Sequence, residues 1–259
     1  MEVIPWCHQL GSLGGQTIEE QVVARFLIDH PIRPGMVRAI LDTLLAQGGA
    51  YEPHLVRRSH DEGLRRITGA RPARLLDEVG EAGSETTFLR VAETHPQPVL
   101  SFSVSPTPRS NPTSVALSVP ASSLDSSKEI ERLLGVCKGL YLFLEAMWGS
   151  AGIADPPGAR RRAGDHDTEY IDWANFFGPD LLASIGPSRL LTSMAFIVEI
   201  LPDGGVMLVS HPTPELARSV EGRALRRQLA EGLSAGPFVP VLKGRTPRGD
   251  HDPAGRPSG

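Results

Sequence analysis

Apolar and polar residues alternate with a period of two in the middle of the chain. In residues 99–105, VLSFSVS, the apolar residues Leu100, Phe102 and Val104 alternate with the other positions. In residues 114–119, SVALSV, every second position is also a large apolar residue. Successive side chains of a strand point to opposite faces, so each stretch predicts a strand with one buried face. Runs of β-branched and other apolar residues predict more strands, at 17–28, 86–94, 193–201 and 206–210. Asp203-Gly204 between the last two predicts a hairpin turn.

Apolar residues at a spacing of three and four predict helices at 34–47 and after Ser126. Glu129 follows Ser126 by three positions, which is the pattern of a capping box, so we expect Ser126 to cap a helix that runs to Trp148. Pro179 and Pro214 each predict the first turn of a helix. A short helix is also expected at 74–81, and residues 149–168 have the composition of a loop.

The order of these elements favours an α+β fold. Strands occur in groups and do not alternate one by one with helices, so we predict a mostly antiparallel sheet with helices packed on one side. The aromatic residues Trp173, Phe176 and Phe177 are expected to form one cluster in the core. By composition the chain divides into a flexible arm at 1–16, a single domain at 17–235 and a disordered tail at 236–259.

Composition narrows the class of protein. The 259 residues are 40% hydrophobic, enough for a core without a disulfide or metal. The formal net charge of −4 argues against a nucleic-acid partner and leaves basic protein partners open. Two cysteines, Cys7 and Cys137, exclude a disulfide framework, and Cys137 on an apolar helix face is expected to be buried. Because no apolar stretch reaches about 18 residues and the N-terminus lacks a signal core, we expect a cytoplasmic protein without a membrane partner.

One triplet suggests metal or acid-base chemistry. Asp165-His166-Asp167 combines two carboxylates with an imidazole, which can ligate a metal or orient a base. A metal-dependent hydrolase using this loop is therefore an alternative function, and it would need further ligands from His54, His60 or His211. The simpler interpretation is a solvated loop, since adjacent residues point in different directions and the same triplet recurs at 250–252.

Three other kinds of motif give weaker indications of catalysis or ligand binding. Ser59-His60-Asp61 names the residue types of a catalytic triad, but a triad is a spatial arrangement. The glycine-rich residues 11–15 lack the Lys-Ser/Thr ending of a phosphate-binding loop. Arg57-Arg58 and Arg160-Arg161-Arg162 could contact phosphate, although carboxylates follow the second run at once. The residues therefore predict no catalytic group, metal site or cofactor.

Residues 170–186, YIDWANFFGPDLLASIG, resemble the Trp-containing segment of a type VI secretion immunity family, in which the Trp precedes two apolar residues, a Gly and a Leu. The resemblance covers residues 20–233, and further stretches fit the family in order, at 25–28, 34–47, 102–104, 113–120, 205–209 and 212–214. The sequence departs from the family at Gly186-Pro187, where a Gly-Gly pair is usual, and it lacks a clear Gly-Asp after Pro212-x-Pro214.

The resemblance implies a protein that is not an enzyme and that neutralises a cognate toxin by occlusion. Several members are paired with nuclease effectors, and the acidic balance suits a partner that carries a basic surface for its substrate. We therefore expect a toxin-binding surface at four closely spaced carboxylates, Asp165, Asp167, Glu169 and Asp172. A solubilising loop, and an interaction protein without a toxin partner, remain open.

Overall fold

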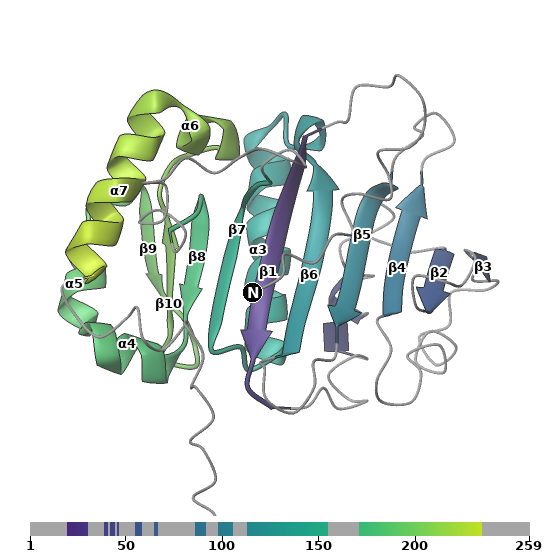
Figure 1. Cartoon of the computed structure of the whole chain (residues 1–259), viewed down its shortest axis with the longest axis horizontal. Coiled ribbons are helices and arrows are strands. Elements are labelled where there is room, and N and C mark those ends of the chain that lie inside the picture. Colours follow the sequence, from purple (N-terminus) through teal and green to yellow (C-terminus); the bar gives the residue numbers. More distant parts are fainter. Residues whose placement is uncertain are drawn as a thin grey trace, which may run out of the picture.

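The computed structural model describes residues 20–30, 39–40, 42–44, 46, 55–58, 65–66, 86–91, 98–105, 113–154 and 171–234. Within these ranges the chain forms one ten-stranded sheet in the order β3-β2-β4-β5-β6-β1-β7-β8-β10-β9, and every neighbouring pair is antiparallel (Figure 1). The strands are β1 (Gln21–Ile28), β2 (Leu55–Arg58), β3 (Arg65–Arg66), β4 (Thr86–Val91), β5 (Pro98–Ser105), β6 (Thr113–Pro120), β7 (Trp148–Ile153), β8 (Ala174–Phe177), β9 (Ile197–Ile200) and β10 (Val206–Val209).

The helices fall into two groups. Figure 1 shows α3 crossing behind the central strands, whereas α4 to α7 gather at the β8–β10 end of the sheet. Residues 39–40, 42–44 and 46 are also helical. The helices are the 3₁₀ turn η3 (Ala121–Ser123) and α3 (Ser127–Phe143), α4 (Pro179–Ile185), α5 (Pro187–Leu191), α6 (Pro214–Arg218) and α7 (Val220–Ser234).

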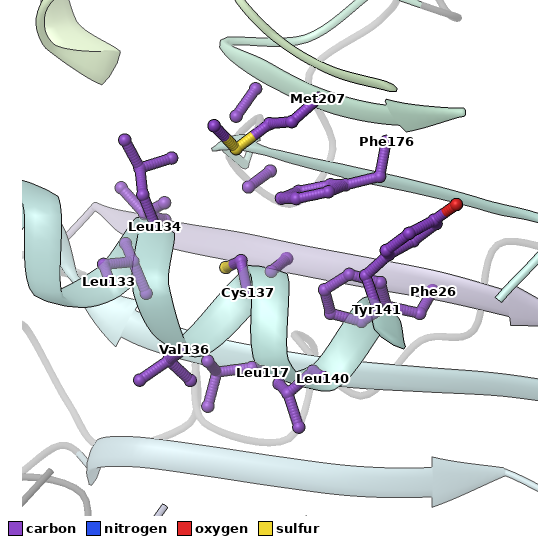
Figure 2. Close-up of a cluster of buried hydrophobic side chains, with 14 of the residues drawn as sticks. Phe26, Leu117, Leu133, Leu134, Val136, Cys137, Leu140, Tyr141, Phe176 and Met207 are labelled. Carbon is purple, nitrogen blue, oxygen red and sulfur yellow. The ribbon is translucent and has the colours of Figure 1, made fainter. Parts of the chain in front are cut away.

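The larger core lies between α3 and one face of the sheet (Figure 2). Tyr141 of α3 stacks on Phe176 of β8 with ring centroids 5.4 Å apart, and Phe26 of β1 lies 5.8 Å from the same ring. All three rings are fully buried. Because aromatic side chains bury large apolar areas, this trio fixes α3 across strands that are distant in the sequence.

A second core lies on the opposite face of the sheet. Successive residues of a strand face opposite sides, so Phe177 and Val206 point away from α3 while Phe176 and Met207 point toward it. The second core is completed by buried side chains from α4, α5 and α7, namely Leu181, Leu182, Ile185, Leu190, Leu229, Ala230 and Leu233. The β8–β10 end of the sheet is thus covered on both faces.

The predicted α+β class and antiparallel sheet are confirmed. The helices do not all pack on one side as predicted, because α3 covers one face of the sheet and α4, α5 and α7 cover the other. The predicted strands at 17–28, 86–94, 99–105, 114–119, 193–201 and 206–210 all form, with somewhat different ends. Ser126 caps α3 as predicted, since its hydroxyl accepts a hydrogen bond from the backbone N–H of Glu129 at 3.3 Å.

Three predictions from the pattern were wrong. Helix α3 ends at Phe143, and Glu145, two residues later, takes a positive φ of 47°. Trp148 is therefore the first residue of β7, and the predicted loop at 149–168 starts with a strand. The predicted aromatic cluster is divided, because Trp173 and Phe176 lie in the core beside α3 whereas Phe177 points to the opposite face of β8. The helix predicted to begin at Pro214 ends already at Arg218, and α7 follows Ser219 as a separate helix.

Other predictions lie outside the described residues: the arm at 1–16, the helix at 74–81 and the tail at 236–259. Strands β2 and β3 were not predicted. Within the described ranges no helix combines the length and apolar character needed to cross a bilayer.

Candidate functional site

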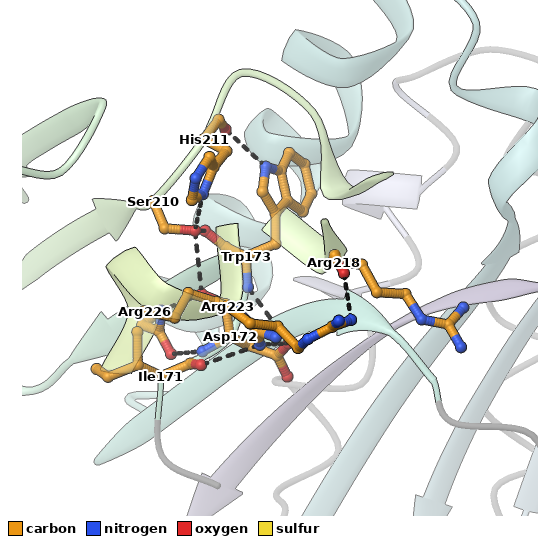
Figure 3. A network of polar contacts seen from close by, with 9 residues as sticks. Ile171, Asp172, Trp173, Ser210, His211, Arg218, Arg223 and Arg226 are labelled. Carbon is orange, nitrogen blue, oxygen red and sulfur yellow. Dashed lines mark hydrogen bonds and ion pairs between the residues drawn. The ribbon is translucent and has the colours of Figure 1, made fainter. Parts of the chain in front are cut away.

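Trp173 joins the start of β8 to the end of β10 (Figure 3). Its side chain is buried, and its indole Nε1 donates a hydrogen bond to the carbonyl of His211 at 2.9 Å. The backbone N–H of Ser210 donates to the carbonyl of Trp173 at 2.8 Å. Two stretches that carry the family resemblance, the Trp segment and the segment leading into Pro212-x-Pro214, therefore meet here.

The backbone of Asp172 is fixed by Asn175 on β8. The amide oxygen of Asn175 accepts from the N–H of Asp172 at 2.9 Å, and its Nδ2 donates to the Asp172 carbonyl at 3.0 Å. Asn175 is fully buried, so both ends of its amide need a partner, and this pair of bonds supplies one at each end. The entry of the chain into β8 is thereby held in one conformation.

The carboxylate of Asp172 is engaged inside the chain. Its Oδ1 accepts from the N–H of Trp173 at 3.3 Å and lies 3.6 Å from Nη1 of Arg226 on α7. Arg226 also donates to the carbonyl of Ile171 at 3.2 Å, and its side chain is only 15% exposed against 39% for Asp172. A Cβ on Gly152 of β7 would lie 1.9 Å from Oδ1, so a glycine is needed there for the carboxylate to reach this position.

His211 and Ser210 lie beside this pair without forming a nucleophile and base. Nδ1 of His211 is 3.1 Å from Oγ of Ser210, but that oxygen is buried and donates its proton to the carbonyl of Trp173 at 3.1 Å. Burial, and then the positive charge of Arg226, lower the pKa of His211 below its usual 6.5. The imidazole is therefore neutral at pH 7 and acts as a polar packing group.

Neighbouring arginines are also committed to contacts within the chain. Nη1 of Arg223 donates to the carbonyl of Arg218 at 2.6 Å, and Arg218 pairs with Glu20 just before β1. These contacts bind α6 and α7 to each other and to the sheet. The polar network of Figure 3 is thus a joint between elements, with the carboxylate of Asp172 at its partly exposed side.

Of the four predicted site residues, the structure describes Asp172 alone. Asp165, Asp167 and Glu169 lie outside the described residues, as do His166, the motifs at 11–15 and 59–61, and Arg160-Arg161-Arg162. Cys137 is buried as predicted, and burial raises the pKa of its thiol to about 12, so it remains protonated. Among the described residues, no three His, Cys, Asp or Glu side chains gather as metal ligands would.

A second surface feature lies at the β9 edge of the sheet. Four large apolar side chains between the end of α5 and the end of β9 are 45–70% exposed: Leu191, Met194, Phe196 and Ile200. We call these four the β9 edge surface. Exposed apolar side chains that gather on a folded domain commonly mark a protein-binding surface.

Sequence reasoning missed both Arg226 and the β9 edge surface. Arg226 is 55 positions from Ile171, and only the packing of α7 on the sheet brings it to Asp172. Residues 193–201 are apolar on both faces, a pattern typical of a central strand, yet β9 lies at the edge. A strand's place in a sheet is set by its neighbours and is invisible in its own residues.

The fold is similar to that of a solved structure from a secretion system. The Pseudomonas aeruginosa T6SS protein PA0821 superposes with a TM-score of 0.58 at 16% sequence identity, over 86% of this chain and 76% of that one. At this identity the likeness concerns the fold. No family model matches the sequence, and neither does any curated protein. The chain is therefore an α+β protein whose fold is shared with a T6SS protein.

Proposed function

We propose that this chain is an immunity protein that binds a cognate bacterial toxin and neutralises it by occlusion. The observation that carries the proposal is the junction at Trp173. Two stretches that resemble the type VI secretion immunity family, 170–186 and the Pro212-x-Pro214 segment, meet there, because the indole bond reaches His211, which directly precedes Pro212. The fold shared with a T6SS protein supports the same class.

The proposed toxin is a nuclease effector of a type VI or polymorphic toxin system. A nuclease presents a basic surface to its substrate, and an inhibitor with a net charge of −4 is drawn to such a surface. On this proposal the chain acts in the cytoplasm by binding protein, catalyses no reaction, and uses no cofactor, nucleic acid or membrane partner.

The proposed recognition segment is the acidic stretch that leads into β8. Asp165, Asp167 and Glu169 precede Asp172 by seven, five and three positions. Asp172 is offset by Arg226 and locked by Asn175, so it serves chiefly to anchor the segment on the sheet. The three preceding carboxylates supply the charge that accelerates association with a basic partner.

Co-expression tests this function directly. The toxin encoded beside this gene is expressed in bacteria with the full chain, with an empty vector, or with a destabilised Trp173→Ala chain. We expect growth with the full chain and killing with the vector, and weakened protection from the variant in proportion to its loss of folded protein. Killing that is equal with the full chain and with the vector would count against the proposal.

A further inference from the structure

Strand β9 is the last strand on its side of the sheet, and no segment that the structure describes pairs with its outer edge. The N–H of Leu201 donates to the carbonyl of Gly205 at 2.8 Å, so the backbone groups of Leu201 face β10. Backbone groups alternate along an antiparallel strand, so those of Val198 and Ile200 face outward. They form a ready template for another strand.

The side chains beside this edge are apolar on one face. Val198 and Ile200 lie opposite Leu208 and Val206 of β10, which point into the core formed with α4, α5 and α7. Ile200 is nevertheless 63% exposed, and Phe196, which precedes the strand, is 57% exposed. The apolar face of β9 is therefore only partly covered, and Phe196 and Ile200 at its two ends are exposed to solvent.

The edge also lacks a free charge that would repel a second copy. The one charged residue of β9 is Glu199, on the opposite face, and Nζ of Lys138 on α3 lies 3.1 Å and 3.2 Å from its two carboxylate oxygens. Natural edge strands commonly use unpaired charges to prevent self-association. In this chain Lys138 offsets the charge of Glu199 within one copy, so Glu199 repels a second copy only where two Glu199 carboxylates lie directly opposite each other.

We propose that β9 is the interface of a symmetric homodimer, in which the β9 strands of two copies pair antiparallel about a two-fold axis at Val198. In this register Val198 exchanges both backbone hydrogen bonds with Val198 of the second copy. Phe196 lies opposite Ile200 of the second copy, and the two-fold axis repeats this pair with the copies exchanged. The outward backbone groups of Val198 and Ile200 are all used. Aromatic and β-branched residues form favourable cross-strand pairs.

The competing register is disfavoured by charge. An axis at Glu199 would also keep the apolar residues of both copies on one face, but it would place the two Glu199 carboxylates directly opposite each other. Like charges in that position are destabilising. With the axis at Val198, Glu199 lies opposite Ile197 of the second copy. Of these two registers, the one with its axis at Val198 pairs apolar residues without opposing like charges, which favours a second copy of this chain as the occupant of the edge.

Sedimentation velocity of the purified full chain over a range of concentrations tests the proposal. We expect a mass that approaches twice 27.9 kDa as concentration rises. Ile200→Lys is expected to raise the dimer dissociation constant by about tenfold or more, since it places a charge in an apolar contact. The matched control Val220→Lys, at a site 70% exposed on α7, is expected to leave the constant unchanged.

The register has its own test. In a chain that carries Cys7→Ser, we expect Val198→Cys to be joined to its copy by a short thiol cross-linker. Circular dichroism confirms that each variant is folded, and Phe196→Lys replaces Ile200→Lys if the latter is not. A parent that stays monomeric at all concentrations, or a folded Ile200→Lys chain that dimerises as strongly as the parent, would overturn the proposal. Loss of toxin binding by Ile200→Lys in a monomeric parent would assign the edge to the toxin instead.

Discussion

The indole nitrogen of Trp173 and the backbone carbonyl of His211 lie 2.9 Å apart, although 38 positions separate the two residues. Trp173 precedes β8 and His211 follows β10, and these two strands pair with each other. The bond closes the open end of that pair. Trp173 is therefore a structural residue that fixes the segment preceding β8 to the body of the sheet.

Truncation of Trp173 is expected to destabilise the fold. Trp173→Ala removes a buried side chain and should lower the free energy of unfolding by about 3–5 kcal/mol. Trp173→Phe keeps most of the ring and loses the indole bond, with a smaller loss of about 1 kcal/mol. Denaturant unfolding measures both. An alanine variant with unchanged stability but no toxin binding would make Trp173 an interface residue.

Gly152 and Asp172 are expected to be coupled. A Cβ on Gly152 would lie 1.9 Å from Oδ1 of Asp172, so Gly152→Ala should cost about 1–3 kcal/mol of stability. In a chain that already carries Asp172→Ala the clash is gone, and the same change should cost clearly less. A double-mutant cycle by denaturant unfolding measures the difference. Additive effects would show that the carboxylate does not limit this position.

Gly135 supplies the control for that experiment. It lies in α3, and a Cβ there would meet nothing within 4 Å. Gly135→Ala is therefore expected to stabilise the chain by about 0.5–1 kcal/mol, because glycine is a poor helix former. The two glycine substitutions should differ in sign.

His211 is expected to make the fold less stable in mild acid. Its pKa in the folded chain lies below the usual 6.5, so between those two values the unfolded chain binds more protons. Stability is complete above pH 6.5, declines as pH falls toward the folded pKa, and levels off below it. In His211→Gln the decline between pH 6.5 and 5 should be shallower. Parallel curves for the parent and the variant would show that His211 titrates normally.

The local structure could be predicted from the sequence where neighbouring residues decide it. Ser126 and Glu129 predict the start of α3. Asp203-Gly204 predicts the turn between β9 and β10, in which the carboxylate of Asp203 accepts a hydrogen bond from the N–H of Gly205 at 2.9 Å. Strand β7 was not predicted, because its sequence, WGSAGI, consists mostly of small residues and shows no alternation of apolar and polar residues. It is a strand because β1 and β8 flank it on both sides.

The candidate site was less predictable, since it depends on contacts between distant elements. Asp172 was selected for its charge, but its role as an anchor follows from Asn175, Arg226 and Gly152, which come from three elements. The spacing of carboxylates in the sequence showed a charged segment. It could not show that Asp172, the one member that the structure describes, is offset by Arg226 of α7.

Neutralising the acidic stretch is expected to slow toxin association. Asp165→Asn, Asp167→Asn and Glu169→Gln together remove the charges that would attract a basic surface. The association rate with the toxin encoded beside this gene should fall most at low salt, and the difference should shrink at about 0.15 M salt, where the Debye length is about 8 Å. Stopped-flow kinetics measure the rate.

The control for that triple variant has the same net charge. Asp125, Glu131 and Glu221 are exposed elsewhere on the chain, so their conversion to Asn, Gln and Gln changes the charge equally without touching the acidic stretch. We expect the control to associate almost as fast as the parent. Equal rates for the two triple variants at low salt would assign recognition to another surface.

A titration of toxin activity tests most directly whether this chain neutralises a toxin by binding it. The purified toxin encoded beside this gene is mixed with increasing amounts of the full chain, and cleavage of its nucleic-acid substrate is measured. We expect cleavage to fall in proportion to the added chain and to end at a stoichiometric ratio. Undiminished cleavage in the presence of a several-fold molar excess of folded chain would contradict it.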